Sequence, residues 1–110
     1  MFSVRVERHD DKTVIELMGE VDYEKRDAIN AAVMDALTAR APELLVDLQA
    51  VTFIDSIGVE AAIVSPARAA GTLGTAFRVE PSVSVRQILH QMGLEDLLRR
   101  AHDAEAEVDE

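Results

Sequence analysis

The sequence predicts a single α/β domain, in which a mixed sheet of four to five strands packs with about four helices. Three observations support this. The 110 residues suit one small domain with its own core. Two alternating segments near the N-terminus, separated by a short polar turn, predict an antiparallel hairpin. Beyond them, strand-like and helix-like segments alternate, which is typical of parallel strands joined by helical crossovers. We therefore expect residues 1–102 to form one domain.

The hairpin is expected from residues 3–8 and 13–19. Val4 and Val6 point one way and their polar neighbours point the other, which is the pattern of a half-buried strand. The polar residues 9–12 form the turn, and residues 13–19 supply the second strand.

The first helix is expected to begin after Asp22, a favourable N-cap residue, and to end before Pro42. Its apolar residues recur at steps of three and one, as on the buried face of an amphipathic helix. These residues are Ile29, Ala32, Val33, Ala36 and Leu37.

Residues 43–48 are nearly all apolar, which predicts a strand that is covered on both faces. Residues 49–58 are expected to connect this strand to a second helix, which runs from about Ser56 toward Gly71 and is rich in alanine. Pro66 lies inside this helix and cannot bond to the Ala62 carbonyl. We expect a kink or an early stop there.

Residues 75–80 alternate as a last strand. The next helix starts either at Ser82 or, by a capping box, at Ser84, and Gly93 ends it. Its apolar stripe comprises Val85, Ile88, Leu89 and Met92, and a short final helix contains Leu94, Leu97 and Leu98. Residues 103–110 hold five acids and no base, so we expect a disordered acidic tail there.

Composition excludes several classes of function. With 11 Lys and Arg against 21 Asp and Glu, the net charge of −10 disfavours direct binding to nucleic acid or to anionic membranes. The chain has no cysteine and no histidine spacing typical of a metal site, so we expect neither a metal nor a cofactor. No apolar run is long enough to span a membrane, and the N-terminus does not resemble a secretory signal. The expected location is the cytoplasm.

The most informative segment is residues 51–59, VTFIDSIGV. Thr52, Asp55 and Ser56 follow a buried strand, and ligands or partners usually bind at the carboxyl ends of such strands. Ser56 stands at or beside a helix start, where a phosphate would be tolerated and would add about −1.5 to −2 charges to the surface. Alternatively, Ser56 or Asp55 is simply the N-cap, and Gly58 a packing residue. The two interpretations are compatible.

Three segments, in order, resemble those of STAS domains, and specifically of bacterial anti-sigma factor antagonists. They are GEVD at 19–22, LLVDLQAVTFIDSIGV at 44–59 and PSVSVRQILHQMGLEDLL at 81–98. The resemblance extends from the first strand to about residue 100. It implies a STAS-like fold for the whole predicted domain.

The resemblance also implies a function that is not enzymatic. Such an antagonist binds an anti-sigma factor that is also a serine kinase, and thereby releases a sigma factor. The kinase inactivates the antagonist by phosphorylating a serine, which is Ser56 by motif position, and a PP2C-type phosphatase reverses this. The contact surface implied for the partner comprises Asp22, Tyr23, Thr52, Asp55, Ser56, Ile57, Gly58, Val59 and Glu60.

Two other hypotheses stay open. Ile57 and Glu60 depart from the usual residues of the family, so the chain could be a STAS binding or scaffold module of a signalling or transport-associated complex, without a phosphorylation cycle. Residues 54–58 also match half of a hydrolase nucleophile elbow, with Ile54 in place of its first glycine. A hydrolase would need a base, and we expect His9, His90 and His102 to be solvated instead.

Overall fold

The computed structural model describes residues 1–98. The predicted acidic tail at 103–110, the end of the predicted domain and His102 lie outside the described residues.

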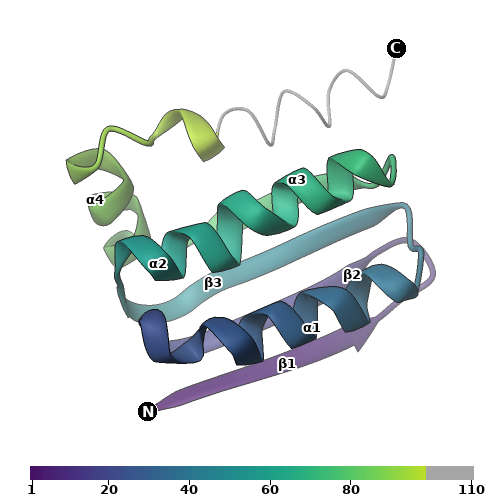
Figure 1. The fold of residues 1–110 in the computed structure, drawn as a ribbon, viewed down its shortest axis with the longest axis horizontal. Helices are drawn as coiled ribbons and strands as arrows, with labels where there is room; N and C mark the ends of the chain where they lie inside the picture. The colour runs from purple at the N-terminus through teal and green to yellow at the C-terminus, as the bar shows by residue number, and fades with distance from the viewer. Residues whose placement is uncertain (99–110) are drawn as a thin grey trace.

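The described residues contain one four-stranded sheet with the strand order β1-β2-β3-β4 (Figure 1). The strands β1 and β2 are antiparallel, and β2–β3 and β3–β4 are parallel, as the sequence predicts. The bounds are Phe2–Arg8 for β1, Thr13–Val21 for β2, Glu43–Ile54 for β3 and Ala76–Pro81 for β4.

Four helical segments accompany the sheet in the described residues. The 3₁₀ turn η1 (Tyr23–Lys25) leads into α1 (Arg26–Thr38). A second continuous segment comprises α2 (Ser56–Val59), the π-helical turn η2 (Glu60–Val64) and α3 (Ser65–Thr72). α4 (Val83–Gln91) follows β4, and residues 96–98 are helical.

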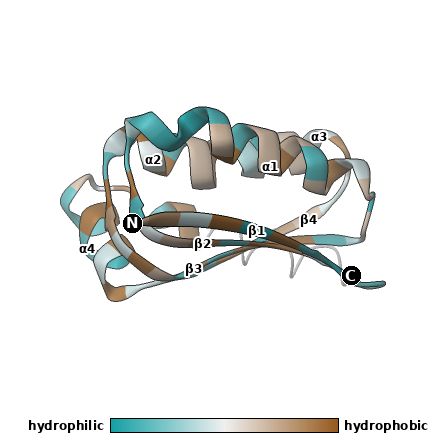
Figure 2. Cartoon of the chain, turned by 90° about the horizontal axis from the view of Figure 1, so that it is seen from below, coloured by the Kyte–Doolittle hydropathy of each residue, from teal (hydrophilic) through white to brown (hydrophobic). Residues whose placement is uncertain are grey.

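The helices are distributed unevenly around the sheet. Figure 2 shows α1, α2 and α3 together on one face. Their buried side chains meet those of β2 and β3 in a core that includes Leu17, Ile29, Leu48 and Ala62. α4 lies at the end of the sheet instead, and packs mainly against β3 through the buried Val85 and Leu89 (Figure 1).

β3 is longer than its sequence predicts. The expected strand ends at residue 48, and residues 49–58 were assigned to a connection, whereas β3 continues to Ile54. The extra residues pair with the end of β2, where Val21 faces Ile54 across the ladder and two register shifts interrupt the pairing. Because of these register shifts, polar and apolar residues do not alternate regularly in this segment, and the sequence does not indicate a strand. The prediction of a connection was therefore wrong for residues 49–54.

Pro66 does not stop the second helical segment, which continues to Thr72. Proline has no backbone N–H to donate. The π-helical turn directly before Pro66, in which the Ser65 N–H bonds to the Glu60 carbonyl, lets the helix continue without that hydrogen bond. Of the two outcomes expected at Pro66, a kink or an early stop, the early stop is therefore wrong, and the helical winding changes to a π-helical turn before the proline.

The last helix begins at the earlier of the two predicted positions. The Ser82 hydroxyl accepts a hydrogen bond from the Val85 N–H at 3.1 Å, and Gly93 follows the helix with a φ of +70°. Met92, the last residue of the predicted apolar stripe, stands at the C-cap and is 36% exposed.

Candidate functional site

The carboxyl ends of β2 and β3 bring the two predicted halves of the site together. Val21 and Ile54 are ladder partners, so Asp22 and Asp55 leave the sheet side by side. Each aspartate then begins a helical segment as its N-cap. We refer to residues 20–24 and 52–60 as the carboxyl edge.

Asp55 ties the two segments of the carboxyl edge to each other. One carboxylate oxygen, Oδ1, accepts a hydrogen bond from the Gly58 N–H at 2.7 Å and thereby caps α2. The other, Oδ2, accepts one from the Tyr23 N–H at 3.0 Å. The Asp55 N–H in turn donates to the Val21 carbonyl at 3.2 Å. The position of α2 relative to β2 therefore depends on this one side chain.

Asp22 has a more local role. Its Oδ1 atom accepts hydrogen bonds from the Glu24 N–H at 3.1 Å and from the Lys25 ammonium at 3.3 Å. The Lys25 ammonium also lies 5.6 Å from the centre of the Phe2 ring, a cation–π distance. Asp22 is therefore a cap whose charge is already balanced by a base.

Ser56 is the first residue of α2 and is exposed. Because Asp55 supplies the cap, the Ser56 hydroxyl is not needed for it, and this hydroxyl forms no hydrogen bond with a described residue. The prediction that either Ser56 or Asp55 is the N-cap is thus confirmed, and the residue is Asp55. The serine side chain is left accessible to another molecule.

Gly58 and Val59 lie beneath this surface. A side chain at Gly58 would collide with the Val21 carbonyl oxygen and would lie 2.9 Å from Ile54 Cγ1, so only glycine lets α2 approach β2 this closely. Val59 is 1% exposed and belongs to the core. These two members of the expected contact surface therefore hold α2 in place and offer no side chain to a partner.

The other expected contact residues are accessible. Thr52, Tyr23, Ile57 and Glu60 are all exposed. The sequence reasoning missed Phe53, which is 51% exposed beside them. A register shift interrupts the ladder between Val51 and Phe53, so Thr52 and Phe53 are both exposed between the buried Val51 and Ile54. Simple alternation along the strand would not have revealed Phe53.

Two kinds of side-chain arrangement matter in residues 1–98, a metal-binding group and a partner for Ser56. These residues contain no group of three or more acidic or histidine side chains that could hold a metal ion. Since the Ser56 hydroxyl has no hydrogen-bond partner among residues 1–98, they also form no serine–histidine pair there. The Glu95 carboxylate, 2.9 Å from His90 Nδ1, accepts a hydrogen bond and raises the pKa of His90 above 6.5.

The protein is thus a small α/β domain, and its candidate site is the exposed part of the carboxyl edge. The model of the STAS domain family matches residues 3–108, and the chain belongs to that family.

Solved structures similar to this chain include anti-sigma factor antagonists. One from Mycobacterium paratuberculosis is 26% identical, with a TM-score of 0.75 over 94% of this chain and 93% of that one. Unphosphorylated SpoIIAA is 22% identical, with a TM-score of 0.70 over 86% and 84% of the two chains. Bacillus SpoIIAA in its phosphorylated form is 21% identical, with a TM-score of 0.66 over 86% and 87%. A search of curated proteins by sequence gave no match.

Within residues 1–98, no helix has the length and apolar character needed to cross a membrane.

Proposed function

We propose that this chain is an anti-sigma factor antagonist, a non-enzymatic switch that binds an anti-sigma factor kinase and thereby releases a sigma factor. The observation that carries the proposal is the free, exposed hydroxyl of Ser56 beside the capping Asp55. The proposed contact residues are the exposed members of the carboxyl edge, with Gly58 and Val59 supporting them from below.

The switch is a phosphoryl transfer to Ser56. A bond forms between Ser56 Oγ and the γ-phosphorus of ATP, the bond from that phosphorus to ADP breaks, and a base of the kinase takes the hydroxyl proton. A PP2C-type phosphatase returns the serine by hydrolysis of the phosphate ester. The chain itself supplies only the acceptor oxygen and the surface that the kinase binds.

Charge accounts for the loss of binding after phosphorylation. The phosphate adds about −1.5 to −2 charges. It would stand next to Asp55 and within a turn of Glu60, on a protein whose net charge is already −10. Docking would then have to desolvate a cluster of like charges, which disfavours the complex. We place this cycle in the cytoplasm, where the chain would contact proteins and neither nucleic acid nor membrane.

The solved neighbours support the proposal. Their structures include SpoIIAA both with and without phosphate, so the fold is compatible with the two states that a switch needs.

Phosphosite mapping tests the proposal directly. After incubation of the chain with the cognate anti-sigma factor kinase and ATP, we expect one phosphate, on Ser56, by mass spectrometry of peptides. The variant Ser56→Ala is the control and is expected to take up none. Phosphate on another residue, or none on the unaltered chain, would contradict the proposed switch.

A binding module without a phosphorylation cycle is the second candidate. It is favoured by Ile57, a branched apolar side chain that is 39% exposed directly beside the acceptor serine. Under this alternative the carboxyl edge binds its partner through permanent apolar contacts, and the state of Ser56 has no effect on affinity.

A further inference from the structure

The aromatic residues of this chain are concentrated at one end of the sheet. The sequence contains only four, and Phe2, Tyr23 and Phe53 all stand at the carboxyl ends of β2 and β3. The fourth, Phe77, is buried in the core. Tyr23 and Phe53 are 61% and 51% exposed, although aromatic side chains are usually covered.

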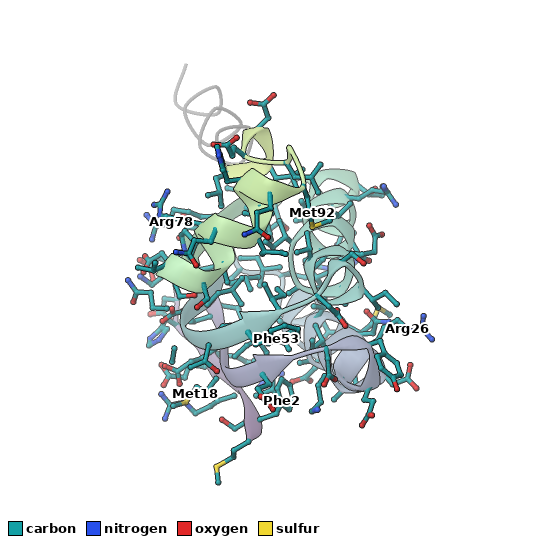
Figure 3. The ribbon with its side chains drawn as sticks, turned by 90° about the vertical axis from the view of Figure 1, so that its left-hand side faces the viewer. Phe2, Met18, Arg26, Phe53, Arg78 and Met92 are labelled. Carbon is teal, nitrogen blue, oxygen red and sulfur yellow. The ribbon has the colours of Figure 1, made fainter. Side chains whose placement is uncertain are left out.

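Phe53 is exposed because β3 extends past its neighbour. β4 pairs with β3 only from Glu43 to Leu48. Residues 49–54 therefore have β2 on one side and no strand on the other. α4 lies on that open side, but its side chains do not fill the space beside residues 52–54. A hollow of about 230 Å³ is left between Thr52, Phe53 and Ile54 on one side and Ser84, Gln87, Ile88 and Gln91 on the other. Figure 3 looks onto this end of the molecule, with Phe53 near its centre.

The hollow is uncharged, and the carboxyl edge that adjoins it is acidic. None of the residues that line the hollow carries a charge. Glu20, the ladder partner of Phe53, belongs to the carboxyl edge, as do the exposed Glu24 and Glu60, which form no ion pair with a described residue. On the opposite side of the hollow, α4 carries the exposed Arg86. The side chain of Arg26 points away from Phe53 (Figure 3). An apolar centre with a charged rim is the usual anatomy of a protein-binding hot spot.

We propose that Phe53 and the hollow beside it form a second docking element, which accepts an apolar side chain from a basic surface of the partner protein. The proposal rests on the proposed function, because the partner is the anti-sigma factor kinase. Phe53 lies three positions before Ser56 and faces α4, so one partner that contacts both must straddle the end of β3. Phe53 then contributes to the affinity for the partner, and a phosphate on Ser56 prevents the partner from binding.

A second apolar hollow provides an internal control. It measures about 380 Å³, lies between α1 and α3, and includes the exposed Met34 and Leu73. The residues that line it include Arg40 and no acid. It also shares no residue with the acidic carboxyl edge, so it is not expected to attract the same basic surface.

The test measures the affinity of the unmodified full chain for the purified kinase by titration calorimetry. Removing a central aromatic anchor typically weakens binding by about 30-fold or more, and we expect this for Phe53→Ala. Gln87→Trp, on the exposed face of α4, fills the hollow while the Phe53 side chain stays in the protein, and it is expected to weaken binding about tenfold. Met34→Ala is the matched control and should bind like the unaltered chain. Thermal unfolding checks that each variant is folded.

The outcomes separate this proposal from the proposed function. If Ser56→Asp abolishes binding while Phe53→Ala and Gln87→Trp bind within twofold of the unaltered chain, the docking element is refuted and the switch stands. If the unaltered chain neither binds the kinase nor is phosphorylated, the proposed function fails, and the docking element fails with it. Equal losses in Phe53→Ala and Met34→Ala would also refute the docking element.

Discussion

The helices α2 and α4 both follow a strand and begin at or next to a serine, and the two serines are used differently. At the start of α4, Ser82 is itself the N-cap, and its hydroxyl accepts a hydrogen bond from the Val85 N–H at 3.1 Å. At the start of α2, the preceding Asp55 is the cap, at 2.7 Å from the Gly58 nitrogen. Ser56 follows it with an exposed side chain and no hydrogen-bond partner among the described residues.

The difference lies in what each hydroxyl contributes to the fold. Ser82 is half-buried and its oxygen already contributes to helix stability. Ser56 is exposed and forms no hydrogen bond with a described residue, so under the proposed function we expect a change in its chemistry to alter binding with little effect on stability.

The largest expected effect is on the affinity for the partner. Ser56→Asp places a negative charge where the phosphate would be, and we expect it to weaken binding of the anti-sigma factor kinase by about 100-fold. Ser56→Ala should bind within about threefold of the unaltered chain, because it removes a hydroxyl with no internal contact. Calorimetric titration measures both. Equal affinities for the two variants would favour the scaffold alternative.

The next effect concerns the residue that frees Ser56 from capping. Asp55→Ala removes hydrogen bonds from both the Gly58 and the Tyr23 N–H groups. We expect it to lower the free energy of unfolding by about 2–3 kcal/mol. Asp22→Ala is the matched control and loses one backbone bond, with an expected cost of about 1 kcal/mol. Urea denaturation measures the difference, and equal costs would show that Asp55 does not bridge the two segments.

A smaller effect compares the serines themselves. Ser82→Ala removes the cap of α4 and should cost about 1 kcal/mol of unfolding free energy. Ser56→Ala should cost less than about 0.5 kcal/mol, as is usual for a surface residue without partners. If denaturation gave the reverse order, the two helix starts would have been assigned wrongly.

The smallest effect lies at the other end of α4. The folded-state pKa of His90 is raised by its hydrogen bond to Glu95 and by the charge of that carboxylate. The stabilisation is therefore complete below the unfolded pKa of 6.5 and is lost as the pH rises through the raised folded value. A proton NMR titration should give a His90 midpoint above 6.5, and Glu95→Gln should lower it. Because both groups are exposed, the change in stability should be small.

Much of the fold could be read from local pattern. The hairpin, the buried face of α1, the cap at Asp22 and the strand–helix alternation all depend on residues near each other in the chain, and each is confirmed. The Asp55–Ser56 pair was also located correctly, because a buried strand followed by polar residues and a helix has a recognisable pattern.

The errors all arise where distant segments determine the structure. The end of β3 is a strand because it pairs with β2. The helix continues past Pro66 because a π-helical turn precedes the proline. The residues of that turn, Ala61, Ala62 and Ile63, are held in the core by packing. Phe53 was overlooked because its exposure depends on where β4 stops and α4 begins.

By itself, the sequence determined the class of fold, the acidic charge and the place of Ser56 between a strand and a helix, since these follow from composition, period and adjacency. Only the tertiary structure decided which residue caps α2, which neighbours of Ser56 face outward and which lie in the core. The physical reason is that a hydrogen bond such as that from Tyr23 to Asp55 joins groups 32 residues apart. No local pattern in either segment encodes the other.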